Sequence, residues 1–190
     1  MMDNFEKDIT QSLEVLQSGG LILYPTDTVW GIGCDATNET AVRKIFELKQ
    51  RPASNAMIVL LAEEREVLKY VAAVDLSLFD FLKTMERPTT VVYDGALGLA
   101  PNVLNADGSI GIRICREPFC RALIKRFRKP LVSTSANISG QPTAATFSQV
   151  GDVIKEGVDY AVHYRRQDET ISAPSSVIRW KDGRVSILRP

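Results

Sequence analysis

The sequence predicts an α/β fold, in which a mixed β-sheet is covered by helices on both faces. Segments with strand periodicity alternate with segments of helical periodicity along the 190 residues, an order typical of a sheet between helices. The last two strand patterns are joined across 181–184 (KDGR) as a hairpin, so the sheet contains an antiparallel pair. We find no internal repeat or linker, and we expect one domain over residues 1–190.

The first half of the chain begins with an amphipathic helix. Apolar residues recur at helical spacing from Phe5 to Leu16, and Gly19-Gly20 end this helix, which we predict over residues 3–18. The elements that follow are strands at 21–24, 56–61 and 89–93, and helices at 39–50, 63–70 and 75–86.

The second half continues the alternation after a loop. Residues 94–108 are rich in Gly, Asn, Asp and Pro and lack a period, so we expect a loop there. In 109–115 three isoleucines alternate with other residues, which indicates a half-buried strand. The remaining elements are a helix at 117–128, a strand beginning at Leu131, a weakly helical segment at 146–156, and strands at 159–164, 175–180 and 184–189.

Composition excludes several classes of site. The 23 basic and 23 acidic residues give zero net charge, which argues against bulk electrostatic capture of nucleic acid. The single histidine, His163, cannot form a histidine-rich metal site, and it disfavours a Ser-His-Asp triad. Cys34, Cys115 and Cys120 form no C-x-x-C motif, so we expect them to be reduced, buried and inert.

No apolar segment approaches the ~20 residues that a membrane span needs. The charged start of the chain also lacks the apolar core of a signal peptide. We therefore expect a cytoplasmic protein with no membrane partner.

Four polar segments follow predicted strands or helices, and ligands commonly bind beyond strand ends in open α/β sheets. Residues 24–33 (YPTDTVWGIG) fit either a tight turn or a ligand loop. Residues 49–52 (KQRP) end a helix, where the helix dipole favours cations in any case. Lys49 and Arg51 could meet on one anion only if the backbone leaves helical geometry between them.

Of the other two segments, 133–140 follows a buried strand and 109–113 (SIGIR) lies within a half-buried one. Residues 133–140 (STSANISG) fit a hydrogen-bonded turn with an N-cap, or a loop presenting hydroxyls and N–H groups to a phosphate. A nucleophilic serine there would need a base, and the G-x-S-x-G elbow is absent. Arg113 lies on the opposite strand face from its isoleucine neighbours, as an exposed arginine or as a carboxylate clamp.

A basic helix offers a further candidate surface. Five cations occur within nine residues, which fits a solvated helix face or a contact surface for RNA phosphates. They are Arg121, Lys125, Arg126, Arg128 and Lys129.

Taken together, YPTDTVWGIG, KQRP, GIRIC and STSANISG, in this order and spacing, resemble the YrdC-like threonylcarbamoyl-AMP synthases. The resemblance runs from about Gly20 to the end of the chain. It implies a twisted mixed sheet flanked by helices, with a large concave cavity. It also implies a nucleotidyltransferase that forms threonylcarbamoyl-AMP and pyrophosphate from L-threonine, bicarbonate or CO2, and ATP.

The resemblance also implies partners and cofactors. Mg2+ accompanies ATP, with no protein-bound metal or organic cofactor. A downstream threonylcarbamoyl transferase then modifies an adenosine of certain tRNAs, and direct tRNA binding stays open. The alternative is a non-catalytic RNA-binding module of the same fold.

Site residues are carried over by position. Lys49 and Arg51 match the family's K-x-R motif, and Ser135 and Asn137 match its S-x-N motif, so these four would hold the ATP phosphates and the metal environment. Further contacts to ATP fall on Asn55, Ser109, Thr143 and Arg189. Contacts to threonine fall on Thr28, Arg113, Ser133 and Ser175, with Arg113 holding the carboxylate and Ser133 acting through its backbone.

The chain departs from the family pattern in places. Leu60 stands where many members have a histidine that touches threonine, so part of the amino-acid pocket differs. Residues 87–91 (RPTTV) replace the common P-G-P-V-T, so a glycine turn is lost. The given sequence ends at Pro190, and we expect it to lack the additional C-terminal domain of the longer members. Both K-x-R and S-x-N are kept, whereas a related subfamily of unclear activity degrades them.

Overall fold

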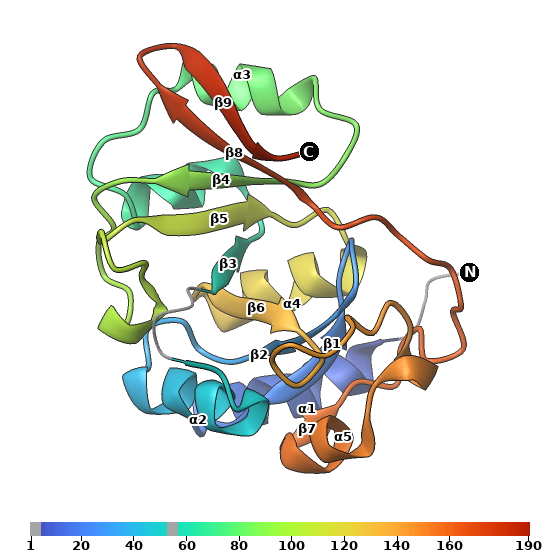
Figure 1. Ribbon diagram of the computed structural model, residues 1–190. Helices are drawn as coiled ribbons and strands as arrows, with labels where there is room; N and C mark the ends of the chain where they lie inside the picture. The colour runs from blue at the N-terminus through green and yellow to red at the C-terminus, as the bar shows by residue number, and fades with distance from the viewer. Residues whose placement is uncertain (1–4, 53–56) are drawn as a thin grey trace.

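The computed structural model describes residues 5–52 and 57–190. Within these residues, strands form one twisted sheet in the order β7-β1-β2-β6-β3-β5-β4-β8-β9 (Figure 1). The pairs β1–β7, β3–β5 and β4–β8 are parallel and the other neighbours are antiparallel, which confirms the mixed sheet. The strands are β1 (Ile22–Pro25), β2 (Trp30–Gly33), β3 (Ile58–Leu61), β4 (Thr89–Tyr93), β5 (Ile110–Ile114), β6 (Leu131–Ser135), β7 (Tyr160–Ala161), β8 (Ser176–Lys181) and β9 (Arg184–Arg189).

Helices cover both faces of the sheet, as the alternating pattern predicts. The α-helices are α1 (Glu6–Gln17), α2 (Glu39–Lys49), α3 (Ser77–Lys83), α4 (Pro118–Phe127) and α5 (Asp152–Gly157), and the 3-10 helices are η1 (Glu64–Lys69), η2 (Pro101–Val103) and η3 (Phe147–Gln149). Helices α1 and α4 pack with Ile22 and Tyr24 in one buried cluster. Helices α2, α3 and α5 pack with Leu21 and Leu23 in a second. Successive strand residues thus point to opposite faces, as the pleat requires.

The predicted loop at 24–33 contains a strand that the sequence analysis missed. Residues 30–33 form β2, which pairs with β1 as a hairpin, so only the turn at 26–29 is free of the sheet. The prediction of a turn rested on Thr26 and Thr28, whose hydroxyls can bond their own backbone. Gly33 is required within the strand, because a Cβ there would lie 2.6 Å from Cε1 of Tyr24 and 2.7 Å from the carbonyl oxygen of Val132.

Other boundaries are shorter than their patterns suggested. The helix predicted at 75–86 is α3 alone, and 63–70 is the 3-10 helix η1. Strand β6 runs into the predicted polar loop and ends at Ser135, whereas β7 has two residues in place of 159–164. Residues 56–61 are described from 57 onward, and the strand begins at Ile58.

A long connection joins β7 to β8 and passes along the sheet (Figure 1). Its start is fixed by Asp8 of α1, whose carboxylate accepts the backbone N–H groups of His163 and Tyr164, each at 2.9 Å. Its end places Ser175 next to β4, where the Ser175 hydroxyl lies 3.0 Å from that of Thr90. His163 therefore lies just beyond β7 rather than inside a strand. Within the described residues, no helix is both long and apolar enough to cross a membrane.

Candidate functional site

Lys49 and Arg51 lie together because helix α2 ends between them. Lys49 is the last residue of α2, and Gln50 adopts the left-handed conformation with a φ of 50°. The backbone N–H of Arg51 then turns back to the carbonyl oxygen of Phe46 at 3.0 Å. Such a turn satisfies carbonyl groups at a helix end and takes the chain out of helical geometry. This departure from helical geometry between Lys49 and Arg51 is the condition under which both cations can bind one anion.

The K-x-R and S-x-N motifs meet through Lys49. Its Nζ donates hydrogen bonds to the backbone carbonyls of Ser135 and Asn137, the latter at 2.6 Å. The backbone N–H of Ser139 returns a bond to the Lys49 carbonyl at 2.9 Å. Two motifs separated by more than eighty residues thus form one structural unit.

Burial changes the acidity of Lys49. The side chain is 1% exposed, and desolvation together with the charge of Arg51 lowers the Lys49 pKa to about 8. Burial also lowers the pKa of Arg51, whose Nη1 lies 3.2 Å from the hydroxyl of Thr134. Two closely spaced cations in a partly dry site favour binding of a multiply charged anion.

Among the described residues, Asn137 makes side-chain hydrogen bonds only through its amide nitrogen. Its Nδ2 donates to the carbonyls of Ile138 at 3.0 Å and Gln141 at 2.7 Å. Its Oδ1 is buried and accepts no hydrogen bond from the described residues. A buried acceptor without a donor costs free energy unless a ligand, water or cation completes it.

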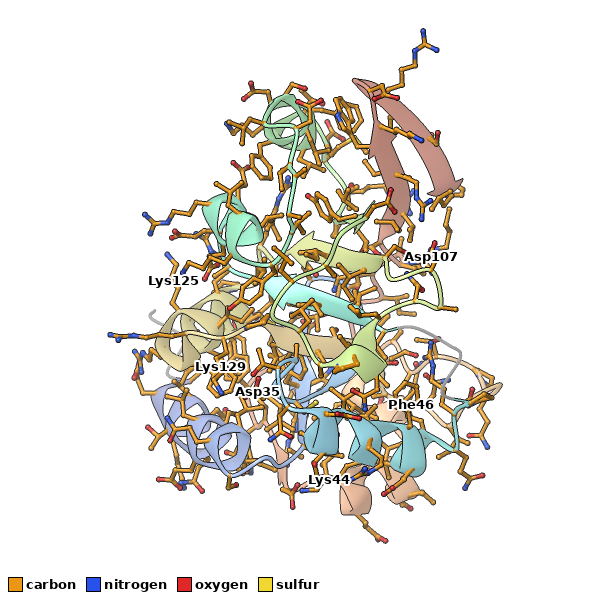
Figure 2. All side chains as sticks on the ribbon, turned by 90° about the vertical axis from the view of Figure 1, so that its left-hand side faces the viewer. Asp35, Lys44, Phe46, Asp107, Lys125 and Lys129 are labelled. Atoms are coloured by element: carbon orange, nitrogen blue, oxygen red, sulfur yellow. The ribbon has the colours of Figure 1, made fainter. Side chains whose placement is uncertain are left out.

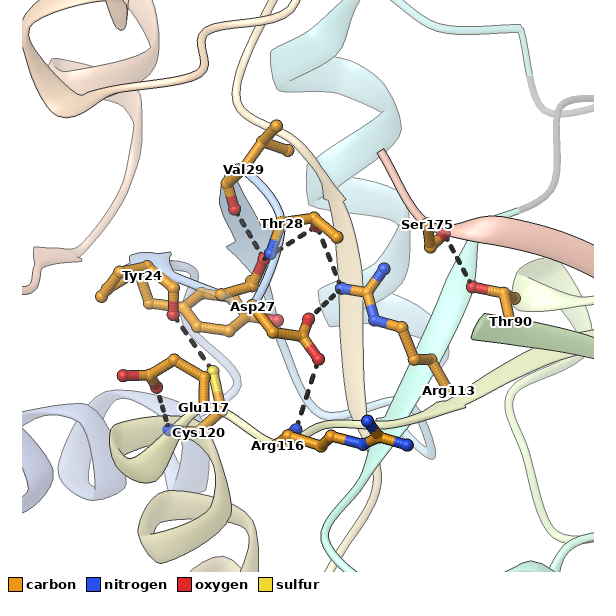
Figure 3. A network of polar contacts seen from close by, with 12 residues as sticks. Tyr24, Asp27, Thr28, Val29, Thr90, Arg113, Arg116, Glu117, Cys120 and Ser175 are labelled. Atoms are coloured by element: carbon orange, nitrogen blue, oxygen red, sulfur yellow. Dashed lines mark hydrogen bonds and ion pairs between the residues drawn. The ribbon is translucent and has the colours of Figure 1, made fainter. Parts of the chain in front are cut away.

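Arg113 is the centre of a second group (Figure 3). The guanidinium is 3% exposed, which contradicts the reading of an exposed strand arginine. Its Nη2 lies 3.1 Å from Oδ1 of Asp27 and 3.3 Å from Oγ1 of Thr28, both in the β1–β2 turn. Because Ile112 belongs to the cluster under α2, Arg113 points to the other face of the sheet. The geometry favours the carboxylate clamp.

Ser175 and Arg189 lie beside this group. The Arg189 guanidinium donates to the Ser175 carbonyl oxygen from Nε at 3.2 Å and from Nη2 at 2.9 Å. The Ser175 hydroxyl bonds Thr90, which stands opposite Arg113 in the β4–β5 pairing. Ser175, predicted for threonine, and Arg189, predicted for ATP, are therefore in direct contact.

Strand register brings the remaining serines to the same end of the sheet. Ser133 of β6 is paired with Ile58 of β3, which is paired with Gly111 of β5. Strand β6 runs antiparallel to both, so Ser135 and Ser109 lie two residues beyond this level in the same direction. The Ser109 hydroxyl donates to Asp107 at 2.6 Å and accepts from Asn105 at 2.9 Å, which fixes its position.

Three further positions taken from the family pattern are Thr143, Asn55 and Leu60. Thr143 is exposed and makes no hydrogen bond among the described residues. Asn55 lies outside the described residues, and its predicted contact with ATP stays a prediction. Leu60 is fully buried and is the register neighbour of Arg113 on β3, so the change from histidine falls beside the clamp.

The sequence analysis missed Asp27, Thr90 and Thr134 as site residues. Asp27 and Thr134 lie inside motifs that it quoted, but periodicity could not show which side chains face Arg113 or Arg51. Thr90 is identified only by its pairing with Arg113 and its contact with Ser175. No local signal identified Asp27, because the need for a partner follows from the burial of Arg113, which the fold provides.

A cavity of about 780 Å³ is lined by residues of η1, α3, β5 and α4, and none of the described site residues predicted from the sequence lines it. Its lining includes Leu82 of α3 and the two isoleucines that flank Arg113. The large concave cavity expected at the phosphate site stays a prediction. Among the described residues, no three His, Cys, Asp or Glu side chains lie close enough to hold a metal ion.

The basic helix α4 is largely neutralised within the protein. Lys125 lies 2.6 Å from Glu63, Arg126 is paired with Glu6 through two bonds, and Lys129 lies 2.6 Å from Asp35. Figure 2 labels Lys129 and Asp35 side by side below Lys125. Paired cations attract phosphates less strongly than free ones, so α4 is a poor RNA-binding surface.

The chain is similar to known proteins in both sequence and structure. A family model named Sua5/YciO/YrdC, with the description "Telomere recombination", matches residues 14–190. The chain belongs to the Sua5/YciO/YrdC family. Among curated relatives in this family, the threonylcarbamoyl-AMP synthase of Vibrio campbellii is 36% identical over 152 residues, which are 78% of this chain and 80% of that protein. The Escherichia coli (strain HS) threonylcarbamoyl-AMP synthase is 33% identical over 154 residues, 79% of this chain and 81% of that one.

Solved structures of Sua5/YciO/YrdC proteins agree with the fold. P. abyssi Sua5 in complex with L-threonine has a TM-score of 0.85 and 26% identity, covering 97% of this chain and 54% of that chain. E. coli YciO has a TM-score of 0.81 and 25% identity, covering 96% and 88%. This chain thus spans about half the length of P. abyssi Sua5 and most of the length of YciO.

Proposed function

We propose that this chain is a threonylcarbamoyl-AMP synthase, a nucleotidyltransferase that uses ATP, L-threonine and bicarbonate or CO2. One observation carries the proposal: Lys49 joins the K-x-R and S-x-N motifs into a single structural unit. The names of the relatives support it, as does the P. abyssi Sua5 complex with L-threonine.

The reaction needs positioned charge rather than an enzyme nucleophile. The unprotonated amine of threonine adds to CO2 and releases a proton to solvent, which gives a carbamate anion. A carbamate oxygen then attacks the α-phosphorus of ATP, the bond to the β-phosphate breaks, and pyrophosphate leaves. Negative charge grows on the phosphate oxygens during this displacement, so cations and donors fixed beforehand lower the barrier.

Each residue has a role in this proposal that follows from the chemistry of its side chain. Lys49 and Arg51 neutralise the phosphates of ATP. The Ser135 hydroxyl and the uncommitted Oδ1 of Asn137 supply oxygens near the Mg2+ that arrives with ATP, since hard cations prefer oxygen ligands. Ser109, Arg189, Asn55 and Thr143 contact the remainder of the nucleotide in this proposal.

Threonine binds on the Arg113 side of the site. Arg113 holds the carboxylate, while Thr28, Ser175 and the backbone of Ser133 contact the rest of the amino acid. The product is a mixed anhydride, which passes to a downstream transferase acting on tRNA. We place the reaction in the cytoplasm, where ATP and tRNA are available.

The test measures pyrophosphate release by the purified chain with Mg2+-ATP, L-threonine and bicarbonate. We expect release only when threonine and bicarbonate are both present. Arg51→Ala and Asn137→Ala should each remove most of the activity without unfolding the protein. Arg121→Ala, on the exposed surface of α4, is the matched control and should stay fully active. Full activity in Arg51→Ala would show that the phosphate site lies elsewhere.

No observation favours the alternative of an RNA-binding module. Three of the five cations on and after α4 are paired within the protein. The relatives that match most of the chain carry the name of a synthase.

A further inference from the structure

Asp27 and Arg113 form a buried ion pair inside the threonine side of the site. Their side chains are 9% and 3% exposed, and Oδ1 of Asp27 lies 3.1 Å from Nη2 of Arg113. The other oxygen of Asp27 accepts the backbone N–H of Arg116 at 3.3 Å. Asp27 therefore links the β1–β2 turn to the chain that leaves β5, and it holds Arg113 from outside its own strand.

The pair leaves most of the guanidinium unused. Asp27 and Thr28 both contact Nη2. The Nε group is buried and makes no hydrogen bond to any described residue. The side-chain contacts of Arg113 with the described residues all go through Nη2. A guanidinium has five N–H groups in a fixed plane, so fixing one nitrogen sets the direction of the others.

We propose that Asp27 is the positioning residue for the substrate carboxylate, acting through Arg113 rather than by touching the carboxylate itself. This inference rests on the proposed function. Without Asp27 the buried Arg113 would lose its counter-charge and one of the two side-chain contacts that hold its Nη2. The side chain would then turn toward other acceptors.

The charge of Asp27 does not oppose this role. The guanidinium lies between Asp27 and the side that faces Ser175 and Thr90, as Figure 3 shows. A substrate carboxylate on that side meets the positive charge first. Asp27 should therefore govern the affinity for threonine and leave the affinity for ATP unchanged, because Lys49 and Arg51 hold the phosphates separately.

The experiment compares Asp27→Asn, Asp27→Glu and wild type in pyrophosphate release, with threonine and ATP titrated in turn. For Asp27→Asn we expect the KM for threonine to rise about tenfold or more, because the buried Arg113 loses its counter-charge. The KM for ATP should change less than about twofold. Asp27→Glu keeps the charge on a longer side chain, so its KM for threonine should fall between the two.

Asp35→Asn is the matched control. Asp35 is also a buried aspartate, 4% exposed, paired with Lys129 at 2.6 Å, and it lies outside the candidate site. We expect this variant to lose stability with both KM values unchanged.

Three results would overturn the inference. One is an unchanged or lower KM for threonine in Asp27→Asn, or in Asp27→Glu if the asparagine variant does not fold. Another is a parallel rise of both KM values in Asp27→Asn. The third is a rise in the threonine KM of Asp35→Asn equal to that of Asp27→Asn. A wild-type protein without threonine-dependent release would instead reject the proposed function, so the two failures are distinguishable.

Discussion

The buried lysine of the K-x-R motif predicts a pH-dependent stability. In the folded protein the Lys49 pKa is lowered from 10.5 to about 8, chiefly by burial and then by Arg51. Between these two values the unfolded chain binds a proton that the folded chain has released. Stability therefore rises with pH across this window. The full difference is on the order of 3 kcal/mol, since one pKa unit corresponds to about 1.4 kcal/mol.

The assay is urea denaturation of wild type and Lys49→Met at pH 7.5, 8.5 and 9.5. Other titrating groups are shared, so the difference in unfolding free energy between the two proteins isolates Lys49. We expect wild type to gain about 2 kcal/mol relative to Lys49→Met between pH 7.5 and pH 9.5. Lys7→Met, on the exposed surface of α1, controls for the loss of a lysine. A difference in unfolding free energy that does not change with pH would refute the argument that burial destabilises the charged form of Lys49.

Two further predictions follow from the same contacts. ATP binding should raise the Lys49 pKa from about 8 and take up protons near pH 8, because phosphate charge favours the ammonium form. Calorimetry in two buffers of different ionisation enthalpy should give different heats, and equal heats would contradict it. Gly33→Ala should lower the unfolding free energy by about 1 to 3 kcal/mol, since its Cβ would lie 2.6 Å from the Tyr24 ring. Urea denaturation measures this, and wild-type stability would mean that β2 shifts freely.

The order of strands and helices could be predicted because it rests on local periodicity. The strands at 89–93 and 184–189 and helix α2 were predicted to within one residue. Strand β2 was not predicted, because its reason for containing Gly33 is the ring of Tyr24, a contact made only after β1 and β2 pair. The local sequence does not show that Gly33 and the Tyr24 ring will approach each other this closely.

The candidate site, too, could be predicted from the sequence only in part. The resemblance supplied positions such as Lys49 and Arg113, but it did not show their partners. The approach of Asp27 to Arg113 depends on how distant elements pack, whereas the left-handed Gln50 that turns Arg51 back is held by local bonds to Glu47 and Phe46. The choice between an exposed arginine and a carboxylate clamp required the burial of Arg113, which only the fold provides.

Detection of the product with 13C-labelled bicarbonate tests the central claim most directly. The purified chain is incubated with Mg2+-ATP, L-threonine and 13C-bicarbonate, and the mixture is analysed by mass spectrometry. We predict threonylcarbamoyl-AMP carrying one 13C atom, formed by wild type and by Arg121→Ala but not by Arg51→Ala. No labelled adduct with wild type, or equal amounts with Arg51→Ala, would contradict the assignment of the synthase reaction to this site.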